Sequence, residues 1–133
     1  MKNPYRPLER ALGYRFRRKA WLEEALTHPS FRHEHDGLES DLQRLEFLGD
    51  AVLGAITAAF LFRTYPDFQE GQLTRLRSDV TNAACLARLA TAVELGPWLR
   101  LGRGEQLSGG QHRASLLSDA FESVLGAVYM DGG

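Results

Sequence analysis

Apolar residues recur at helical spacing along most of this chain, and the strict alternation that marks strands is absent. Glycine, proline and short polar segments separate the periodic stretches, as they do where helices end. The pattern predicts an all-α fold. The helices that we expect cover residues 8–13, 19–27, 41–65, 74–80, 82–95 and 116–130.

The remaining segments are expected to connect these helices. Residues 33–40 are polar and residues 102–110 are rich in glycine, so both predict loops. Pro29 is expected to end the second helix, and residues 131–133 to turn or fray. With 133 residues and no repeat or linker, the chain predicts one domain over residues 1–133.

Two of the expected helices carry acidic residues among apolar ones. Glu46 and Asp50 are four residues apart and Asp119 and Glu122 three, so each pair shares one helix face. Such a pair is usually a solvated helix edge, but here apolar neighbours lie on nearly every side. Burying each carboxylate costs several kcal/mol unless a cation meets it, and Arg44 is the one basic residue within either segment. Four converging carboxylates would bind Mg²⁺ or Mn²⁺.

The formal net charge is −1, which argues against a simple polyanion binder. Basic residues nevertheless gather in two groups. The first group contains Arg6, Arg10, Arg15, Arg17, Arg18, Lys19 and Arg32, and the second contains Arg75, Arg77, Arg88, Arg100, Arg103 and Arg113. Two interpretations stay open at this point: a solvated surface, or basic patches that hold a phosphate backbone beside the acidic centre.

Cysteine content and hydropathy bear on the compartment. Cys85 is the single cysteine, which excludes an internal disulfide and fits a reducing compartment. No apolar segment follows Met1 and Lys2, and we expect no apolar run near the ~18 residues of a membrane span. These observations predict a cytoplasmic protein that does not contact a membrane.

The segment LSGGQ at 107–111 spells the signature loop of ABC-type ATPases. That function also needs the phosphate-binding pattern G-x-x-x-x-G-K-[ST], which this sequence lacks. A flexible connector between helices explains the glycines equally well. We therefore expect no nucleotide cofactor.

Five segments resemble, in order, the motifs of the ribonuclease III family. The resemblance extends over 8–133. The segments are ALTHPSF at 25–31, RLEFLGDAVL at 44–53, EGQLTRLR at 70–77, LGRGE with SGG between 101 and 110, and LLSDAFESVLGA at 116–127.

This resemblance implies the all-α endonuclease domain of the bacterial type, which works as a homodimer. Each subunit would bind Mg²⁺, with Mn²⁺ a possible substitute, and the dimer would cut both strands of double-stranded RNA to leave 5′-phosphate and 3′-hydroxyl ends. The implied metal ligands are Glu46, Asp50, Asp119 and Glu122. Of these, Asp50 and Glu122 are expected to be most coupled to catalysis. Phe47 is the candidate for insertion into the partner, with the intrachain core as its alternative place.

The chain departs from the family pattern in two ways. Gln43 stands where the family usually has Glu, and Glu70 matches the acid that normally works with that position. Compared with the family, we expect the last helix of the domain and the double-stranded-RNA-binding domain to be absent from this sequence. The leading hypothesis is an RNA-processing endonuclease. The alternative is a dimeric RNA-binding or ribosome-associated module that does not cleave, and the four retained acids argue against it.

Overall fold

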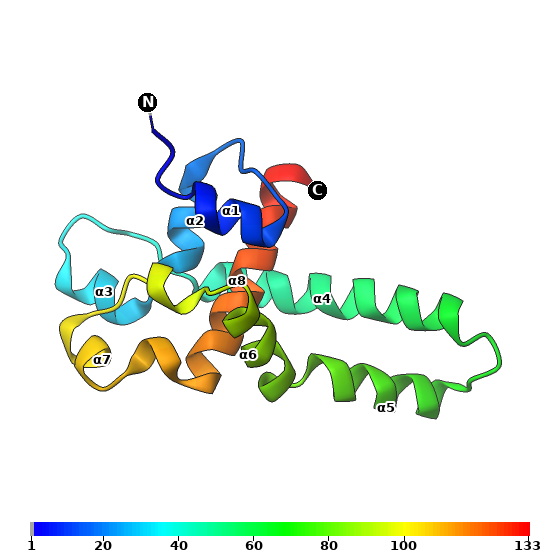
Figure 1. Ribbon diagram of the computed structural model, residues 1–133. Coiled ribbons are helices and arrows are strands. Elements are labelled where there is room, and N and C mark those ends of the chain that lie inside the picture. The colour runs from blue at the N-terminus through cyan, green and yellow to red at the C-terminus, as the bar shows by residue number, and fades with distance from the viewer. Residues whose placement is uncertain (1) are drawn as a thin grey trace.

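The computed structural model describes residues 2–133, which fold into eight α-helices and two short 3-10 turns (Figure 1). The elements in order are α1 (Arg6–Leu12), α2 (Lys19–Leu26), α3 (Pro29–Glu34), α4 (Gln43–Thr64), α5 (Glu70–Thr81), α6 (Ala83–Ala92), η1 (Gly96–Trp98), α7 (Arg103–Leu107), η2 (Gly110–His112) and α8 (Ala114–Gly132). Across these residues the one β-type contact is an isolated bridge between Thr27 and Arg100. The all-α prediction is confirmed.

Helix α8 lies at the centre of the fold and packs against α4, α6 and α2. Its apolar side chains are buried on several sides, as expected of a helix that is hydrophobic over most of its circumference. Leu117 and Val124 of α8 join Leu22 and Leu26 of α2 and Leu45 of α4 in one core cluster. Ser123, also fully buried, donates a hydrogen bond to the carbonyl oxygen of Ala25 at 2.7 Å.

Helices α4 and α8 cross with their backbones in direct contact because two glycines face each other there. A Cβ atom on Gly49 of α4 would overlap the carbonyl oxygen of Glu122, and one on Gly126 of α8 would overlap that of Leu45. Both positions are buried. The absence of side chains at these points brings the acidic turns of the two helices close together.

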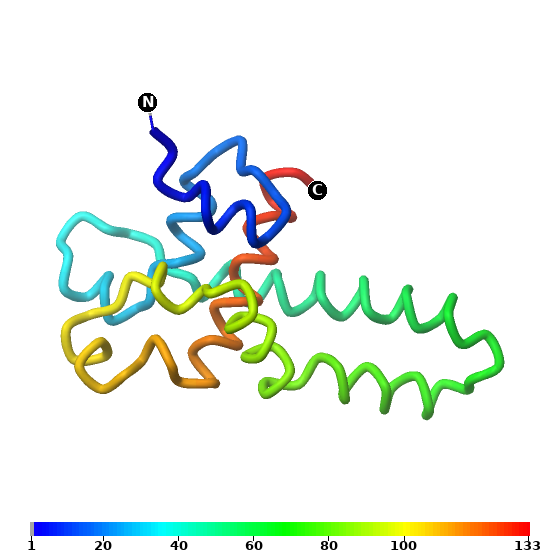
Figure 2. The backbone as a smooth tube through the Cα atoms, viewed as in Figure 1, coloured from blue at the N-terminus to red at the C-terminus, as the bar shows by residue number. Residues whose placement is uncertain are grey.

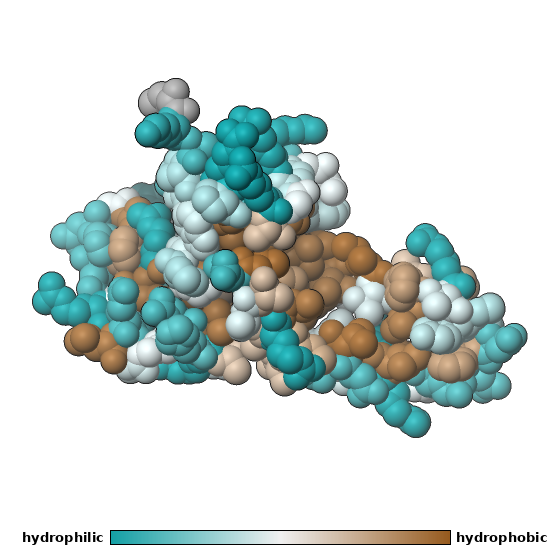
Figure 3. Space-filling model, viewed as in Figure 1, coloured by the Kyte–Doolittle hydropathy of each residue, from teal (hydrophilic) through white to brown (hydrophobic). Residues whose placement is uncertain are grey.

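The second half of α4 extends away from this core and returns as α5, and the two helices form a long hairpin (Figure 2). Several apolar side chains of the hairpin are exposed, and they form a hydrophobic surface, brown in Figure 3, over α4 and between the two helices. The most exposed on this part of α4 are Ile56, Phe60 and Phe62. An exposed apolar area of this kind marks an interaction surface.

The expectation that no apolar run reaches the length of a membrane span is wrong for α4. This helix has 22 residues, and an 18-residue window within it has a mean hydropathy of 1.7 with 17% of the window buried. Length and composition alone would allow it to cross a membrane. However, α4 carries Glu46 and Asp50 and packs along α8, so we interpret its exposed apolar side as a surface for another protein.

Two segments that we expected to be loops contain helices. Pro29 follows the end of α2 at Leu26, as expected, but it also begins α3, where proline at the first position loses no hydrogen bond. The Nδ1 atom of His28 accepts from the amide of Ser30 and caps this helix. Within the glycine-rich segment 102–110, residues Arg103–Leu107 form the single turn of α7. Both helices are too short to show apolar periodicity.

The expectation that the chain frays after residue 130 is also wrong, because α8 continues to Gly132. The carboxylate of Asp131 accepts hydrogen bonds from the hydroxyl of Tyr14 at 2.7 Å and from the backbone amides of Arg17 and Arg18 at 2.8 and 2.9 Å. These long-range contacts fix the final turn. They were not predictable from local sequence.

Candidate active site

Four carboxylates meet where α4 crosses α8. Carboxylate oxygens of Glu46, Asp119 and Glu122 lie within 4.8 Å of one another, and all three side chains are partly buried. Asp50 is more exposed and lies close enough to Glu122 to raise the pKa of that carboxyl group. Helical spacing places both acids of each helix on the face that looks toward the other helix. The structure thus brings together all four acids that the sequence singled out.

The charges of this acidic cluster repel one another. Burial, followed by the charge and hydrogen bond of Asp119, raises the pKa of Glu46 to about 7. Burial, followed by the hydrogen bond and charge of Asp50, raises the pKa of Glu122 to about 8. Crowding of like charges in a partly buried place therefore favours the uptake of a proton or of a cation at these carboxylates.

No ion pair neutralises the cluster within residues 2–133. The ion pairs formed there join Lys19 to Glu9, Arg32 to Asp41 and Arg113 to Glu105. A purely oxygen donor set with uncompensated negative charge suits a hard divalent cation. Ligand oxygens around Mg²⁺ lie roughly 3–4 Å apart, given bonds of about 2.1 Å. The observed spacing fits such an ion after small side-chain movements.

A cavity of about 160 Å³ opens beside the acidic cluster, with Glu46 and Asp119 in its wall. His28, Gln43 and Arg113 also line it, so donors and acceptors surround the space next to the carboxylates. The sequence analysis did not assign His28 to the site, and it named Arg113 only as one member of the second basic group. For His28 a signal existed, because it lies in the segment ALTHPSF, but Arg113 lies outside every motif.

Gln43 and Glu70 do not meet within one chain. Gln43 begins α4 and lies next to the acidic cluster, whereas Glu70 begins α5, beyond the opposite end of α4. A helix of 22 residues spans about 33 Å at 1.5 Å per residue. Cooperation between these two positions would therefore require a second copy of the chain.

Phe47 points away from the core. Its side chain is 80% exposed, which excludes the alternative that it packs inside its own chain. It borders a cavity of about 620 Å³ whose walls include Trp21, Leu48 and Met130. A large exposed aromatic residue next to an apolar hollow is the arrangement expected at the centre of a protein interface.

Comparisons with known proteins agree with this geometry. The sequence model of the Ribonuclease-III-like family matches residues 18–133. The chain is 50% identical over 127 residues to "Ribonuclease 3" of Syntrophotalea carbinolica, covering 95% of this chain and 55% of that protein. It is 51% identical to "Ribonuclease 3" of Geobacter sulfurreducens, covering 95% of this chain and 51% of that protein. The chain thus spans about half the length of the curated relatives it matches.

Solved structures show the same likeness. The nuclease domain of ribonuclease III from Campylobacter jejuni superposes with a TM-score of 0.90 at 36% identity, covering 97% of this chain and 87% of that one. A second crystal structure of that nuclease domain gives a TM-score of 0.89 at 38% identity, covering all of this chain and 86% of the other. This chain belongs to the Ribonuclease-III-like family and has the fold of its nuclease domain.

Proposed function

We propose that this protein is a homodimeric, Mg²⁺-dependent endonuclease that hydrolyses phosphodiester bonds in double-stranded RNA, as part of RNA processing. The observation that carries the proposal is the acidic cluster, in which carboxylate oxygens of Glu46, Asp119 and Glu122 lie within 4.8 Å of one another and Asp50 lies beside Glu122. Family membership supplies the substrate class, since the relatives at about 50% identity are named Ribonuclease 3.

Each acid has a distinct part in this proposal. Glu46 and Asp119 are mainly metal ligands, and Asp50 and Glu122 are the ligands most closely coupled to the reaction. A bound Mg²⁺ supplies a lowered pKa for an attacking water and charge stabilisation for the leaving 3′ oxygen, and Mn²⁺ offers similar chemistry. The products would carry 5′-phosphate and 3′-hydroxyl ends. The raised pKa of Glu122 means that acidification competes with metal binding at this site.

The proposed dimer brings two acidic clusters to one RNA duplex. Phe47 of each chain would enter the hollow beside Leu48 and Met130 of the other, since a two-fold interface pairs the same patch on both copies. Antiparallel pairing along α4 would also bring the hairpin end of one chain toward the acidic cluster of its partner. Glu70 would then approach Gln43 across the interface, which a single chain cannot achieve.

Cleavage of a long RNA duplex tests the proposal directly. The purified protein is incubated with end-labelled duplex at low salt, with Mg²⁺ or with a chelator. We expect shortening of the duplex with Mg²⁺ only, and products that a 5′-phosphate-dependent exonuclease degrades. Glu122→Gln should abolish cleavage without changing the sedimentation of the protein, whereas Glu39→Gln, on an exposed loop, should not. Near wild-type cleavage by Glu122→Gln would refute the assignment.

Gln43 is the feature that supports an alternative function without cleavage. An amide in place of the usual acid removes one negative charge beside the cluster, which favours a dimeric module that binds RNA without cutting it. Metal-independent binding with no cleavage by wild-type protein would support this alternative. Recovery of cleavage by Gln43→Glu would then identify the amide as its cause.

We also propose a cytoplasmic location, where double-stranded RNA precursors are processed. The lone Cys85 is compatible with a reducing compartment, and no disulfide can form within the chain.

A further inference from the structure

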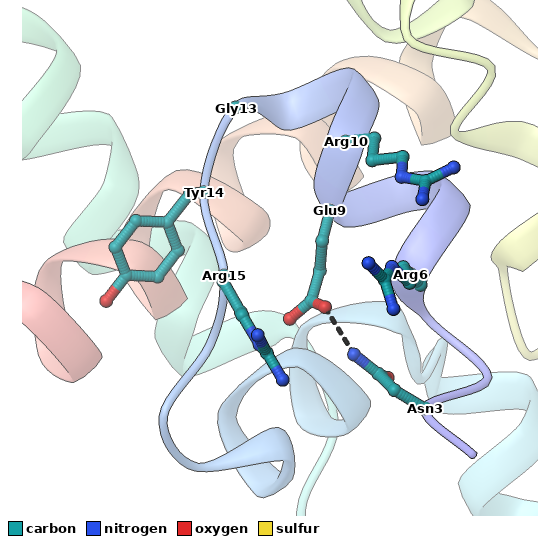
Figure 4. A pocket seen from close by; sticks show the side chains of 7 residues that line it. All are labelled: Asn3, Arg6, Glu9, Arg10, Gly13, Tyr14 and Arg15. Atoms are coloured by element: carbon teal, nitrogen blue, oxygen red, sulfur yellow. Dashed lines mark hydrogen bonds between the residues drawn. The ribbon is translucent and has the colours of Figure 1, made fainter.

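A pocket lined by three arginines lies at the N-terminal end of the molecule (Figure 4). It has a volume of about 350 Å³ and lies between α1 and the segment that follows it. Arg6 and Arg10 come from α1, four residues apart and on one helix face. Arg15 comes from the following segment and faces the pocket from its other side.

The end of α1 determines this arrangement. Gly13 adopts φ 71°, a left-handed conformation that glycine accepts without strain and that reverses the chain after the helix. The amides of Gly13 and Tyr14 donate to the carbonyl oxygens of Arg10 and Glu9, at 3.3 and 3.1 Å, and fix the reversal. The chain therefore folds back and carries Arg15 to the side opposite Arg6 and Arg10.

The pocket also contains one acidic residue, Glu9, whose carboxylate is fully engaged. It accepts from Asn3 at 2.6 Å, from the amide of Phe16 at 2.7 Å and from the Lys19 ammonium at 2.7 Å. Burial raises the pKa of Glu9, but these hydrogen bonds outweigh it and hold the pKa below the ordinary value. Because Lys19 neutralises Glu9, the three guanidinium groups leave the pocket with a net positive charge of about three.

The three guanidinium groups have no carboxylate partner among residues 2–133, where every ion pair involves other side chains. Guanidinium groups bind phosphate oxygens with two parallel hydrogen bonds, and a pocket of this size lies within the range of small-ligand sites. The side chain that contributes an aromatic ring, Tyr14, turns away to bind Asp131, so a nucleobase would find no stacking partner there.

We propose that Arg6, Arg10 and Arg15 form a phosphate-binding site separate from the acidic cluster. Tyr14 bonds to Asp131, which lies twelve residues beyond Asp119 on α8, or about 18 Å along the helix. The phosphate belongs either to the backbone of an RNA duplex that extends past the acidic cluster or to a small phosphorylated molecule. The proposal does not require cleavage, and it stands on the pocket alone.

Two binding measurements distinguish these two sources of the phosphate. Both are made in the presence of a chelator, so that metal-dependent cleavage does not interfere. The probes are a short RNA duplex, titrated at several salt concentrations, and inorganic pyrophosphate, followed by calorimetry. The test variant is Arg10→Gln/Arg15→Gln. The control is Arg17→Gln/Arg88→Gln, which removes the same charge from exposed positions outside the pocket. Thermal unfolding of both variants establishes that they are folded.

If the duplex is the source, the pocket variant binds RNA about tenfold more weakly than the control. The slope of the logarithm of its binding constant against the logarithm of the salt concentration is also smaller in magnitude than that of the control, by about two. If a small phosphorylated molecule is the source, the pocket variant loses pyrophosphate binding and keeps the RNA affinity of the control. Either result supports the site. Equal losses in the pocket variant and the control, or no loss in either measurement, would overturn it.

Discussion

Neutralising Glu122 should stabilise the metal-free protein at alkaline pH. Its pKa is raised from 4.5 to about 8 by burial and by the neighbouring acids, Asp50 first. Between these two pH values the folded protein holds a proton that the unfolded chain has released. The free energy of unfolding therefore falls as the pH rises through this window, and the full stability is present below about pH 4.5. Glu46, with a pKa of about 7, adds to the same trend.

The size of the effect follows from the shift. Each pKa unit corresponds to about 1.4 kcal/mol, so the Glu122 shift alone would correspond to roughly 5 kcal/mol. Because the side chain is partly open to solvent, water screens a large part of this penalty, and we expect about 2–3 kcal/mol. For a domain of this size, that difference changes the melting temperature by roughly 8–12 °C.

The assay is thermal unfolding in chelator at pH 5, 7 and 9 for wild type, Glu122→Gln and the exposed control Glu39→Gln. Wild type and control should lose stability toward pH 9, and Glu122→Gln should lose clearly less. In a parallel series with saturating Mg²⁺ in place of chelator, wild type should regain stability at pH 9 and Glu122→Gln should change little, because binding to the folded state alone stabilises it. A wild-type protein that grows more stable from pH 5 to pH 9 without metal would refute this reasoning.

Other perturbations test the packing and the interface. Gly49→Ala and Gly126→Ala should each destabilise the fold by about 3 kcal/mol or more in denaturant unfolding, since the new methyl group overlaps backbone of the facing helix; an unchanged midpoint would contradict the close crossing. Ser123→Ala should cost about 1–2 kcal/mol, because the buried carbonyl of Ala25 loses one donor, and a neutral result in the same assay would show that this bond is dispensable. Phe47→Ala should shift the protein toward monomer in sedimentation equilibrium with little change in its helical circular dichroism, and an unaltered association constant would remove Phe47 from the proposed interface.

Helical periodicity predicted the long elements and the convergence of the acids. The helices over 41–65 and 116–130 appear within two or three residues of their observed bounds, because each carries apolar residues over several turns. The spacing of Glu46, Asp50, Asp119 and Glu122 predicted which face each would occupy. It did not predict the distance between the two helices, which depends on Gly49 and Gly126 meeting in space.

The features that the sequence did not predict share a physical cause, because each depends on contacts between distant parts of the chain or with another chain. The short helices α3 and α7 are held by contacts with each other and by caps such as His28, and neither has enough residues for a periodic signal. The last turn of α8 depends on a bond between residues 14 and 131. The apolar content of α4 did not predict how much of this helix would be exposed, because sequence does not distinguish burial within a chain from burial against another.

The central place of α8 has a consequence for how the protein is made. Helices α2, α4 and α6 all pack against this helix, which is synthesised after all three of them. While the ribosome is still translating residues before 114, these helices lack their common partner, and two of the four acids do not yet exist. The nascent chain therefore exposes this apolar surface until α8 has been translated, and chaperones would be most needed in that interval. Metal binding at the acidic cluster would have to wait until residues 114–132 have been made.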